Sequence, residues 1–236
     1  MQKKPIILLL IFFIAFISKG SAQEQQKKEA GFIKIFNGKN LEGWEGDTLY
    51  WRVENGILVG EVTAATILKR NSFIIWKNGH TKDFELKVDY RVSAHGNSGI
   101  NYRSVLLDSL PFALKGYQAD IDGEDNWSGQ NYEERGREFL ALRGQKVIIE
   151  TNQKPLVIGK AASKDSLQAY IKKEDWNTYQ LTVKGHRMLH YINGVLMSDV
   201  TDNDKANRTN KGYVGVQVHV GPPMKIEYRN FMLKKL

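Results

Sequence analysis

Phe84-Glu-Leu-Lys-Val-Asp-Tyr-Arg-Val92 alternates strictly between apolar and charged side chains. Its odd members are two aromatic and three aliphatic residues, and each of the four residues between them carries a charge. A period of two residues is typical of a β-strand that buries one face and leaves the other in water. The stretch therefore predicts a sheet with one face packed on a hydrophobic core.

Similar strand signals recur on both sides of this stretch. Asn55-Gly56 and Asn193-Gly194 each separate two short apolar runs, which is the pattern of a tight hairpin. Residues 212–220 and 225–233 read as the last strands. Helical periodicity of any length is missing after the N-terminal segment, so no helices are expected to cover a sheet. The pattern predicts an all-β fold, a two-sheet jelly-roll sandwich.

The N-terminal segment has the three parts of a secretory signal peptide. Lys3 and Lys4 provide the positive start, residues 6–17 are almost wholly apolar, and Gly20-Ser21-Ala22 provides small residues for cleavage. The apolar run of about a dozen residues is shorter than the ~20 that a membrane-spanning helix needs. We expect residues 1–22 to be removed and the protein to be periplasmic or secreted. An uncleaved N-terminal anchor is the alternative.

Composition then sets the domain organisation. Residues 23–30 are polar and charged and are expected to form a flexible leader, and residues 31–236 a single jelly-roll domain. The chain has no cysteine, so its stability must come from its core and not from disulfides. No second long apolar stretch follows, so no membrane span is expected once the signal is removed.

The net charge argues against one class of partner. It is +8 for the whole chain, and three of the lysines lie in the predicted signal peptide, so the mature chain carries +5. The remaining cations are scattered among acidic residues, and no basic stripe with interleaved aromatic residues is present. We therefore expect no nucleic-acid partner.

The strand 116–124 carries the strongest chemical signal. Gln118, Asp120, Asp122 and Glu124 occupy alternate positions and so share one face. Same-face neighbours lie roughly 6.5–7 Å apart, so the three carboxyl groups repel one another. A cation, an arginine or a raised pKa would offset that repulsion, and raised pKa values serve general acid–base chemistry. A site for a divalent metal ion and a purely structural cluster remain alternatives.

Three further segments carry candidate site residues. In residues 213–220 four valines share one face, and Gln217 and His219 lie on the other, where His219 is a candidate acid or base. In residues 95–104 the side chains of Asn97, Asn101 and Arg103 alternate, and Arg103 is placed to pair with the acids or to hold a substrate oxygen. Residues 127–137 read as a loop that contributes Trp127 and Tyr132 for stacking on a sugar, and Glu134 as a further carboxyl. An ordinary solvent face, an ion pair and a salt-bridged loop are the respective alternatives.

Several motifs together resemble the 3-keto-disaccharide hydrolase domain family, in order from about Phe32 to Leu236. They are Phe36-Asn-Gly-Lys-Asn-Leu-Glu-Gly-Trp44, Trp51-Arg-Val-Glu-Asn-Gly56, Asp83-Phe-Glu-Leu86, Gly96-Asn-Ser-Gly-Ile100, Gly116-Tyr-Gln-Ala-Asp120, Trp176-Asn-Thr-Tyr179 and His190-Tyr-Ile-Asn-Gly194. The resemblance implies a concanavalin A-like jelly roll and a periplasmic protein that acts on glycosides oxidised at C3 of the sugar. A carbohydrate is accordingly the expected partner.

The chemistry of such substrates gives each candidate a possible role. A ketone at C3 acidifies the C2 hydrogen, so a base, a donor or cation at the C3 oxygen, and an acid for the leaving group are needed. Candidate bases and acids are Asp120, Asp122 and Glu134. The C3 oxygen can be stabilised by Arg103, by His219 or by a divalent metal ion. The candidate substrate-binding residues are Asn97, Asn101, Gln118, Trp127, Tyr132 and Gln217.

Two other functions stay open. The same face can hold a sugar without catalysis, as a lectin-like module does. A conventional glycoside hydrolase with two carboxylates is the third hypothesis, although Gln118 stands where sandwich-fold glucanases of the laminarinase kind place a glutamate. All three hypotheses require the side chains at 118, 120, 122, 217 and 219 to converge on one hollow.

Overall fold

The alternating stretch lies in the middle of a large sheet. It forms β6 (Phe84–Val92) in the computed structural model of the chain, which describes residues 31–236. Its five apolar side chains are buried and its charged ones are part-exposed, as predicted. The expected signal peptide (1–22) and leader (23–30) lie outside the described residues.

The first sheet has ten strands, with β6 between β13 and β17. Nine of them follow the order β12-β11-β15-β14-β13-β6-β17-β4-β3, and β1 pairs with β17. Neighbours are antiparallel except β11 and β15, which are parallel. The strands are β1 (Ile33–Lys34), β3 (Trp51–Glu54), β4 (Ile57–Val62), β6, β11 (Gln145–Ile149), β12 (Leu156–Lys160), β13 (Asn177–Lys184), β14 (Arg187–Ile192), β15 (Val195–Asp202) and β17 (Met224–Lys235).

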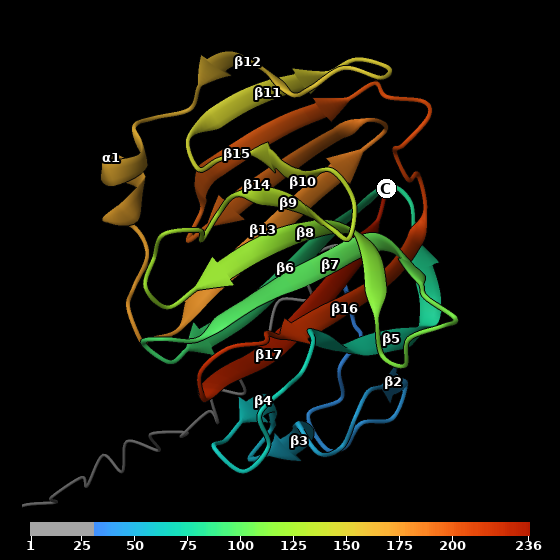
Figure 1. Cartoon of the computed structure of the whole chain (residues 1–236), viewed down its shortest axis with the longest axis vertical. Coiled ribbons are helices and arrows are strands. Elements are labelled where there is room, and N and C mark those ends of the chain that lie inside the picture. The colour runs from blue at the N-terminus through green and yellow to red at the C-terminus, as the bar shows by residue number, and fades with distance from the viewer. Residues whose placement is uncertain (1–30) are drawn as a thin grey trace, which may run out of the picture. The chain divides into compact units, whose positions relative to one another are not determined.

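The second sheet has seven strands and carries the candidate site. Its order is β10-β9-β8-β7-β16-β5-β2, and all its neighbours are antiparallel. In Figure 1 its green strands β7 and β8 lie in front of β6 and β13 of the first sheet. The strands are β2 (Trp44–Glu45), β5 (Ser72–Thr81), β7 (Asn97–Leu106), β8 (Leu114–Asp122), β9 (Asn131–Glu134), β10 (Glu138–Ala141) and β16 (Gly212–Val218).

The hydrophobic core fills the space between the two sheets. Tyr117, Ala119 and Ile121 of β8 point into it, as do the valines of β16. Because strand side chains alternate, the polar residues between them face away from the first sheet. The one α-helix among the described residues, α1 (Lys164–Gln168), is a single short turn. No helix within residues 31–236 is long and apolar enough to span a membrane.

A buried polar bridge links the two sheets inside this core. His190 Nε2 of β14 lies 2.9 Å from the Tyr102 hydroxyl of β7, and its Nδ1 lies 3.2 Å from the Gln130 carbonyl oxygen. A carbonyl only accepts, so Nδ1 carries the proton and Nε2 accepts from Tyr102. Complete burial lowers the pKa of His190 to about 3, which keeps the ring neutral.

Candidate active site

The predicted polar face forms as expected, because the strand register places its residues side by side. Asn97, Gly99 and Asn101 of β7 pair with Asp122, Asp120 and Gln118 of β8, respectively. Gly215 of β16 pairs with Asn101, so the polar residues of β16 continue the same face. The strand phase predicted for positions 118, 120, 122 and 217 is therefore observed, whereas Glu124 and His219 lie just beyond the ends of β8 and β16.

A hollow of about 310 Å³ lies on this outer face, and we call it the central hollow. It is lined by Asn71, Asn97, Gln118, Asp120, Trp127, Gln130, Tyr132, Glu134, Phe139 and His219. Seven of these residues were predicted from the sequence as site residues. The hollow is rich in carboxyl, amide and aromatic groups, which are the groups that bind sugar hydroxyls and stack on sugar rings.

Asp120 is the first carboxyl group of the hollow. Its two oxygens accept hydrogen bonds from Nε2 of Gln118 at 2.8 Å and from Nε2 of Gln130 at 2.5 Å. Burial raises its pKa to about 7; the two amides lower the pKa, and the charges of Glu134 and Asp122 raise it further. A carboxyl group that titrates near neutral pH can both take up and release a proton there.

Glu134, on the neighbouring strand β9, is the second carboxyl group of the hollow. Burial raises its pKa, and the nearby Arg135 guanidinium at 3.5 Å opposes that shift. Gln217 Nε2 lies 3.5 Å from a Glu134 oxygen and 3.2 Å from Gln118 Oε1. A chain of side-chain amides therefore connects the two carboxyl groups. Gln217, the middle member of this chain, is fully buried. It therefore positions other residues and does not line the hollow.

His219 lies at the edge of the central hollow with a defined ring tautomer. Its Nδ1 lies 2.5 Å from the Val220 carbonyl oxygen, which can only accept. The proton is therefore on Nδ1, and Nε2 keeps a free lone pair. Burial lowers the pKa of His219, so the neutral ring is favoured at pH 7.

Asp122 holds a loop in place and is not free for chemistry. One of its oxygens accepts from the backbone N–H of Asn126 at 2.7 Å and of Trp127 at 3.2 Å, and the other from that of Glu124 at 3.2 Å. These bonds fix the β8–β9 loop, which carries Trp127 over the hollow. Asp122 is thus a positioning residue.

The sequence left open a site for a divalent metal ion at the carboxylates. The described residues contain no group of three or more histidine, cysteine or acidic side chains that could hold a metal ion. The oxygens of Asp120 and Asp122 accept instead from amide and backbone N–H groups. These donors use part of the acceptor capacity of the carboxylates. The divalent metal ion therefore stays a prediction from the sequence.

Aromatic rings form one wall of the central hollow. Trp127 and Phe139 are 42% and 46% exposed, and their ring centroids are 5.6 Å apart. Tyr132 meets the edge of Phe139 at 5.2 Å. Exposed aromatic rings beside polar groups offer a stacking surface for the apolar face of a sugar ring.

Four predicted site residues do not line the central hollow. Asp122 and Gln217 are two of them, so the expected convergence on one hollow holds for positions 118, 120 and 219 only. Arg103 and Asn101 are the other two. The prediction that Arg103 is a site residue is wrong. Its guanidinium donates to the carbonyl oxygens of Lys82 and Gly185, and to the carboxylate of Asp83 at 3.0 Å. A β-bulge between Tyr102 and Val105 gives Arg103 a φ of +46° and breaks the alternation counted from Asn97. Asn101 keeps the predicted phase but is completely buried, so it does not reach the hollow.

Three lining residues were missed by the sequence analysis. Gln130 lies in residues 127–137, which read as a loop, Phe139 lies just after them in β10, and Asn71 precedes β5 far from the acid strand in sequence. Asn71 reaches Glu134 at 3.5 Å and binds the backbone N–H of Val220 at 2.9 Å. Only Gln130 carried a local signal, since it stands in the segment that follows the acid strand.

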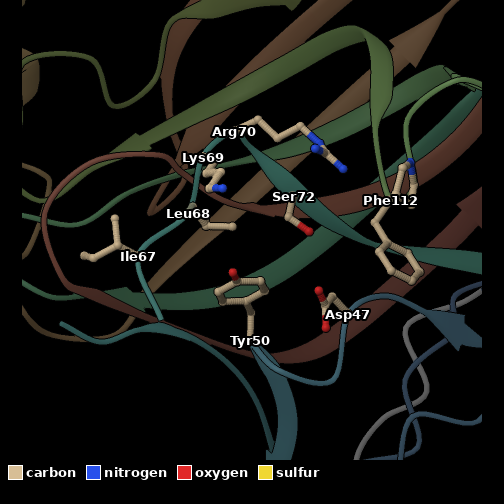
Figure 2. Close-up of a pocket in the computed structure, with 9 residues that line it drawn as sticks. Asp47, Tyr50, Ile67, Leu68, Lys69, Arg70, Ser72 and Phe112 are labelled. Carbon is tan, nitrogen blue, oxygen red and sulfur yellow. The ribbon is translucent and has the colours of Figure 1, made fainter. Parts of the chain in front are cut away.

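A separate hollow of about 270 Å³ lies near the start of β5 and shares no lining residue with the central hollow. Figure 2 shows Asp47 and Tyr50, from the loop before β3, approaching Leu68 and Ser72 on the segment that enters β5. Asp47 is its only carboxyl group. Paired carboxyl groups occur in the central hollow and not here, which makes the central hollow the candidate active site.

The sequence profile of one protein family matches almost all of the described chain. The family is described as the 3-keto-alpha-glucoside-1,2-lyase-like domain, and the match covers residues 31–234. The chain belongs to this family. The match confirms the resemblance to the 3-keto-disaccharide hydrolase domain family, and no curated protein matches the chain.

Solved structures similar to this lyase-like domain agree with its fold. Two candidate glycosyl hydrolases from Parabacteroides distasonis are 22% and 19% identical, with TM-scores of 0.58 and 0.59. The alignments cover 91% and 87% of this chain and 97% and 99% of theirs. A Bacillus subtilis protein with a galectin-like fold is 12% identical with a TM-score of 0.60, over 86% of this chain and 94% of that one. The predicted two-sheet, concanavalin A-like jelly roll is thereby confirmed.

Proposed function

We propose that this protein is an exported enzyme that cleaves 3-keto-glycosides, including 3-keto-disaccharides. The observation that carries the proposal is the pair Asp120 and Glu134, two buried carboxyl groups with raised pKa values in one sugar-sized hollow. Membership of the 3-keto-alpha-glucoside-1,2-lyase-like family supports a carbohydrate-active function.

The reaction starts with proton transfer from C2 of the oxidised sugar. A base takes the C2 proton, and the electron pair of that bond moves toward C3 to give an enolate. The enolate then expels the oxygen substituent at C1. The departing oxygen takes up a proton, and the sugar ring is left with a C1–C2 double bond. Water adds across this double bond, its hydroxyl going to C1 and a proton returning to C2.

The residues of the central hollow suit these steps. Asp120 is the proposed base, because the amides of Gln118 and Gln130 hold its two oxygens and its pKa is about 7. Glu134 is the proposed acid for the leaving group, because burial raises its pKa and favours the protonated form. The side-chain amides of Asn97 and Gln118 are the proposed donors to the enolate oxygen. His219 lacks a proton on Nε2, so it serves as an acceptor.

The decisive experiment offers the purified protein 3-keto-glucosides with several leaving groups and follows their release. We expect turnover, with kcat/KM rising with pH as Asp120 loses its proton near pH 7 and falling again as Glu134 loses its own proton, so that the profile is bell-shaped. Asp120→Asn and Glu134→Gln should each lower kcat by about 10²–10⁴-fold. The exposed Glu138→Gln on β10 is the matched control and should leave kcat unchanged.

A non-catalytic carbohydrate-binding module is the second candidate, and the exposed ring wall of Trp127 and Phe139 favours it. Sugar binding without turnover, retained in Asp120→Asn, would establish that function instead. Activity on unoxidised glycosides would establish a conventional glycoside hydrolase.

Export is part of the proposal and has its own test. The signal-like residues 1–22 motivate it. N-terminal sequencing of protein from the periplasm or the medium should begin at Gln23. Protein found only in the cytoplasm with an intact N-terminus would contradict export.

A further inference from the structure

Strand β12 is the open edge of the ten-stranded sheet, and its side chains lie in solvent. It pairs with β11 on one side, and no described strand pairs with its other side. Figure 1 shows it at the end of the sheet, beyond β11. Its first three residues, Leu156, Val157 and Ile158, are 62%, 47% and 62% exposed. An exposed apolar strand on an open edge is a liability unless something covers it.

A hollow of about 310 Å³ lies beside β12, and it shares no lining residue with the central hollow. Leu156 pairs with Ile148, which stands two residues from Lys146 and so points to the same face of the sheet. This face is turned away from the core. The hollow is lined by Lys146, Val147, Ile158, Arg187, Asp199 and Thr201. The apolar strand therefore borders a polar recess.

Lysines surround the apolar strand. Lys154 and Lys160 flank its aliphatic residues in sequence, and residues 151–164 contain no aspartate or glutamate. Lys146 adds a third amine from the neighbouring strand β11. Among the described residues, none of these three lysines pairs with a carboxylate. Their amines are therefore available to an anionic partner.

The acidic residues nearby do not neutralise this charge. Asp199 on β15 pairs with Arg187 at 2.7 Å, so the two charges cancel. Glu150 follows β11 and accepts from Asn203 Nδ2 at 2.9 Å. One carboxylate thus faces three lysines, and the rim of β12 keeps a net positive charge.

An anionic lipid surface fits this combination better than a second copy of the chain. Two copies paired edge to edge along β12 would bring their lysines to one seam, where like charges repel. A strand of five residues also offers far less contact area than a stable protein interface buries. Lipid headgroups instead supply the opposite charge, and the boundary beneath them takes up aliphatic side chains.

We propose that β12 docks on the surface of an anionic membrane. Leu156 and Ile158 enter the boundary between headgroups and acyl chains, and Lys154 and Lys160 pair with lipid phosphates. Lys146 meets a phosphate in the hollow beside the strand. The central hollow lies on the outer face of the other sheet, so it stays open while β12 is docked. The docking does not depend on the proposed function.

The test measures binding to lipid vesicles by co-sedimentation. The protein is used from Gln23 onward, which removes the apolar residues 6–17 and keeps every strand of both sheets. We expect it to bind vesicles of phosphatidylcholine with about 30% phosphatidylglycerol, and to bind pure phosphatidylcholine at least about tenfold more weakly. About 0.5 M NaCl should release most of the protein from the anionic vesicles, because salt screens the lysines.

A first double variant tests the charged part of the contact. Lys154→Gln with Lys160→Gln should weaken binding to the anionic vesicles about 20-fold, since each lysine near such a surface contributes about fivefold. Lys39→Gln with Lys69→Gln removes the same charge from exposed positions elsewhere. This control should change binding by less than about twofold.

A second double variant tests the apolar part. Leu156→Thr with Ile158→Thr keeps residues that suit a strand but removes aliphatic surface, and it should weaken binding about tenfold or more. Leu49→Thr with Ile67→Thr is the matched control, because these side chains are 60% and 49% exposed. It should leave binding within about twofold of the parent.

Three results would overturn the proposal. The first is a parent protein that does not bind the anionic vesicles. The second is binding that both β12 variants retain, because another surface would then hold the lipid. The third is a dimer in analytical ultracentrifugation that Leu156→Thr with Ile158→Thr abolishes, without vesicle binding, since a second copy would then cover β12. Turnover of 3-keto-glucosides tests the proposed function separately, and this variant should keep kcat/KM within about twofold of the parent.

Discussion

Asp120 and Asp122 stand two residues apart on the same face of β8, yet they have different surroundings. Asp120 accepts from two side-chain amides within the hollow, while Asp122 accepts from three backbone N–H groups of the following loop. Removing a buried acceptor costs about 1–3 kcal/mol of unfolding free energy for each buried donor that it leaves without a partner. Asp122 therefore contributes mainly to stability and to the position of Trp127.

Asp122→Asn should consequently destabilise the protein. An amide NH₂ at one of the two oxygen positions would face a backbone N–H, so we expect a loss of about 2–3 kcal/mol and a fall in melting temperature of about 4–12 °C. Differential scanning calorimetry measures this change. Glu124→Gln, in the same loop but exposed, is the control and should melt with the parent. An unchanged melting temperature with a large loss of kcat would instead assign chemistry to Asp122.

Spacing in the sequence predicted that these carboxyl groups face outward, but it did not predict their partners. The partners of Asp120 come from Gln118 on its own strand and from Gln130, whose segment returns across the strand through the β8–β9 loop. The path of such a loop depends on tertiary contacts with residues distant in sequence, and a local sequence pattern does not reveal these contacts. Residues such as Phe139 and Asn71 were missed for the same reason.

At the scale of strands, Gly99 leaves the space that Gln118 needs. A Cβ at this position would lie 2.6 Å from both Cγ and Cδ of Gln118, whereas the backbone of Gly99 is one that any residue can adopt. Gly99→Ala should therefore displace the Gln118 side chain and remove a donor from Asp120. We expect kcat/KM to fall about tenfold, the loss of one good hydrogen bond.

The pH profile separates this effect from a general disturbance. The Gln118 amide lowers the pKa of Asp120, so its removal should shift the midpoint of the kcat/KM profile to higher pH. Gly159→Ala on β12 is the control, because its nearest neighbour atom is 3.8 Å from the new Cβ. A fall in kcat/KM without a shift of the midpoint would show that Gln118 does not act through Asp120.

Arg103 ties three elements together at the end of β7. Its buried guanidinium satisfies two carbonyl oxygens, one from the β5–β6 turn and one from the β13–β14 turn, and pairs with Asp83. Arg103→Met leaves these groups unpaired and should cost about 3–5 kcal/mol of unfolding free energy, with KM unchanged below the melting transition. Arg187→Met is the control, because the Arg187 side chain is 58% exposed and its pair with Asp199 is worth less than about 1 kcal/mol. A rise in KM with no loss of stability would instead indicate that Arg103 contributes to substrate binding.

The strands themselves could be predicted because alternation and turn pairs are local. Phe84–Val92 forms as predicted, and the strand predicted over 212–220 forms as Gly212–Val218, two residues shorter. The bulge at Arg103 was not predicted, since an extra residue in one strand has no signature in composition. The parallel pairing of β11 with β15 also went unpredicted, because it joins segments about fifty residues apart.

At the scale of the whole molecule, two buried groups shift stability with pH in opposite directions. The pKa of Asp120 is raised from 3.8 to about 7, so the folded protein binds a proton between these values that the unfolded chain has released. Falling pH therefore adds stability through Asp120. The pKa of His190 is lowered from 6.5 to about 3, so below pH 6.5 the unfolded chain binds a proton that the folded protein does not. Falling pH removes stability through His190.

Between pH 7 and pH 5 each of these effects amounts to about 2 kcal/mol, because one pKa unit is worth about 1.4 kcal/mol. Glu134 acts in the same direction as Asp120, and His219 in the same direction as His190. We expect urea unfolding of the parent protein to give nearly the same free energy at pH 7 and pH 5. Asp120→Asn should lose about 2 kcal/mol over this interval, and His190→Gln should gain about 2 kcal/mol, whatever its stability at pH 7. His95→Ala, an exposed histidine, should follow the parent. If both buried-site variants kept the parent's flat profile, neither side chain would have the burial-shifted pKa on which the proposed chemistry at Asp120 and the neutral bridge at His190 depend.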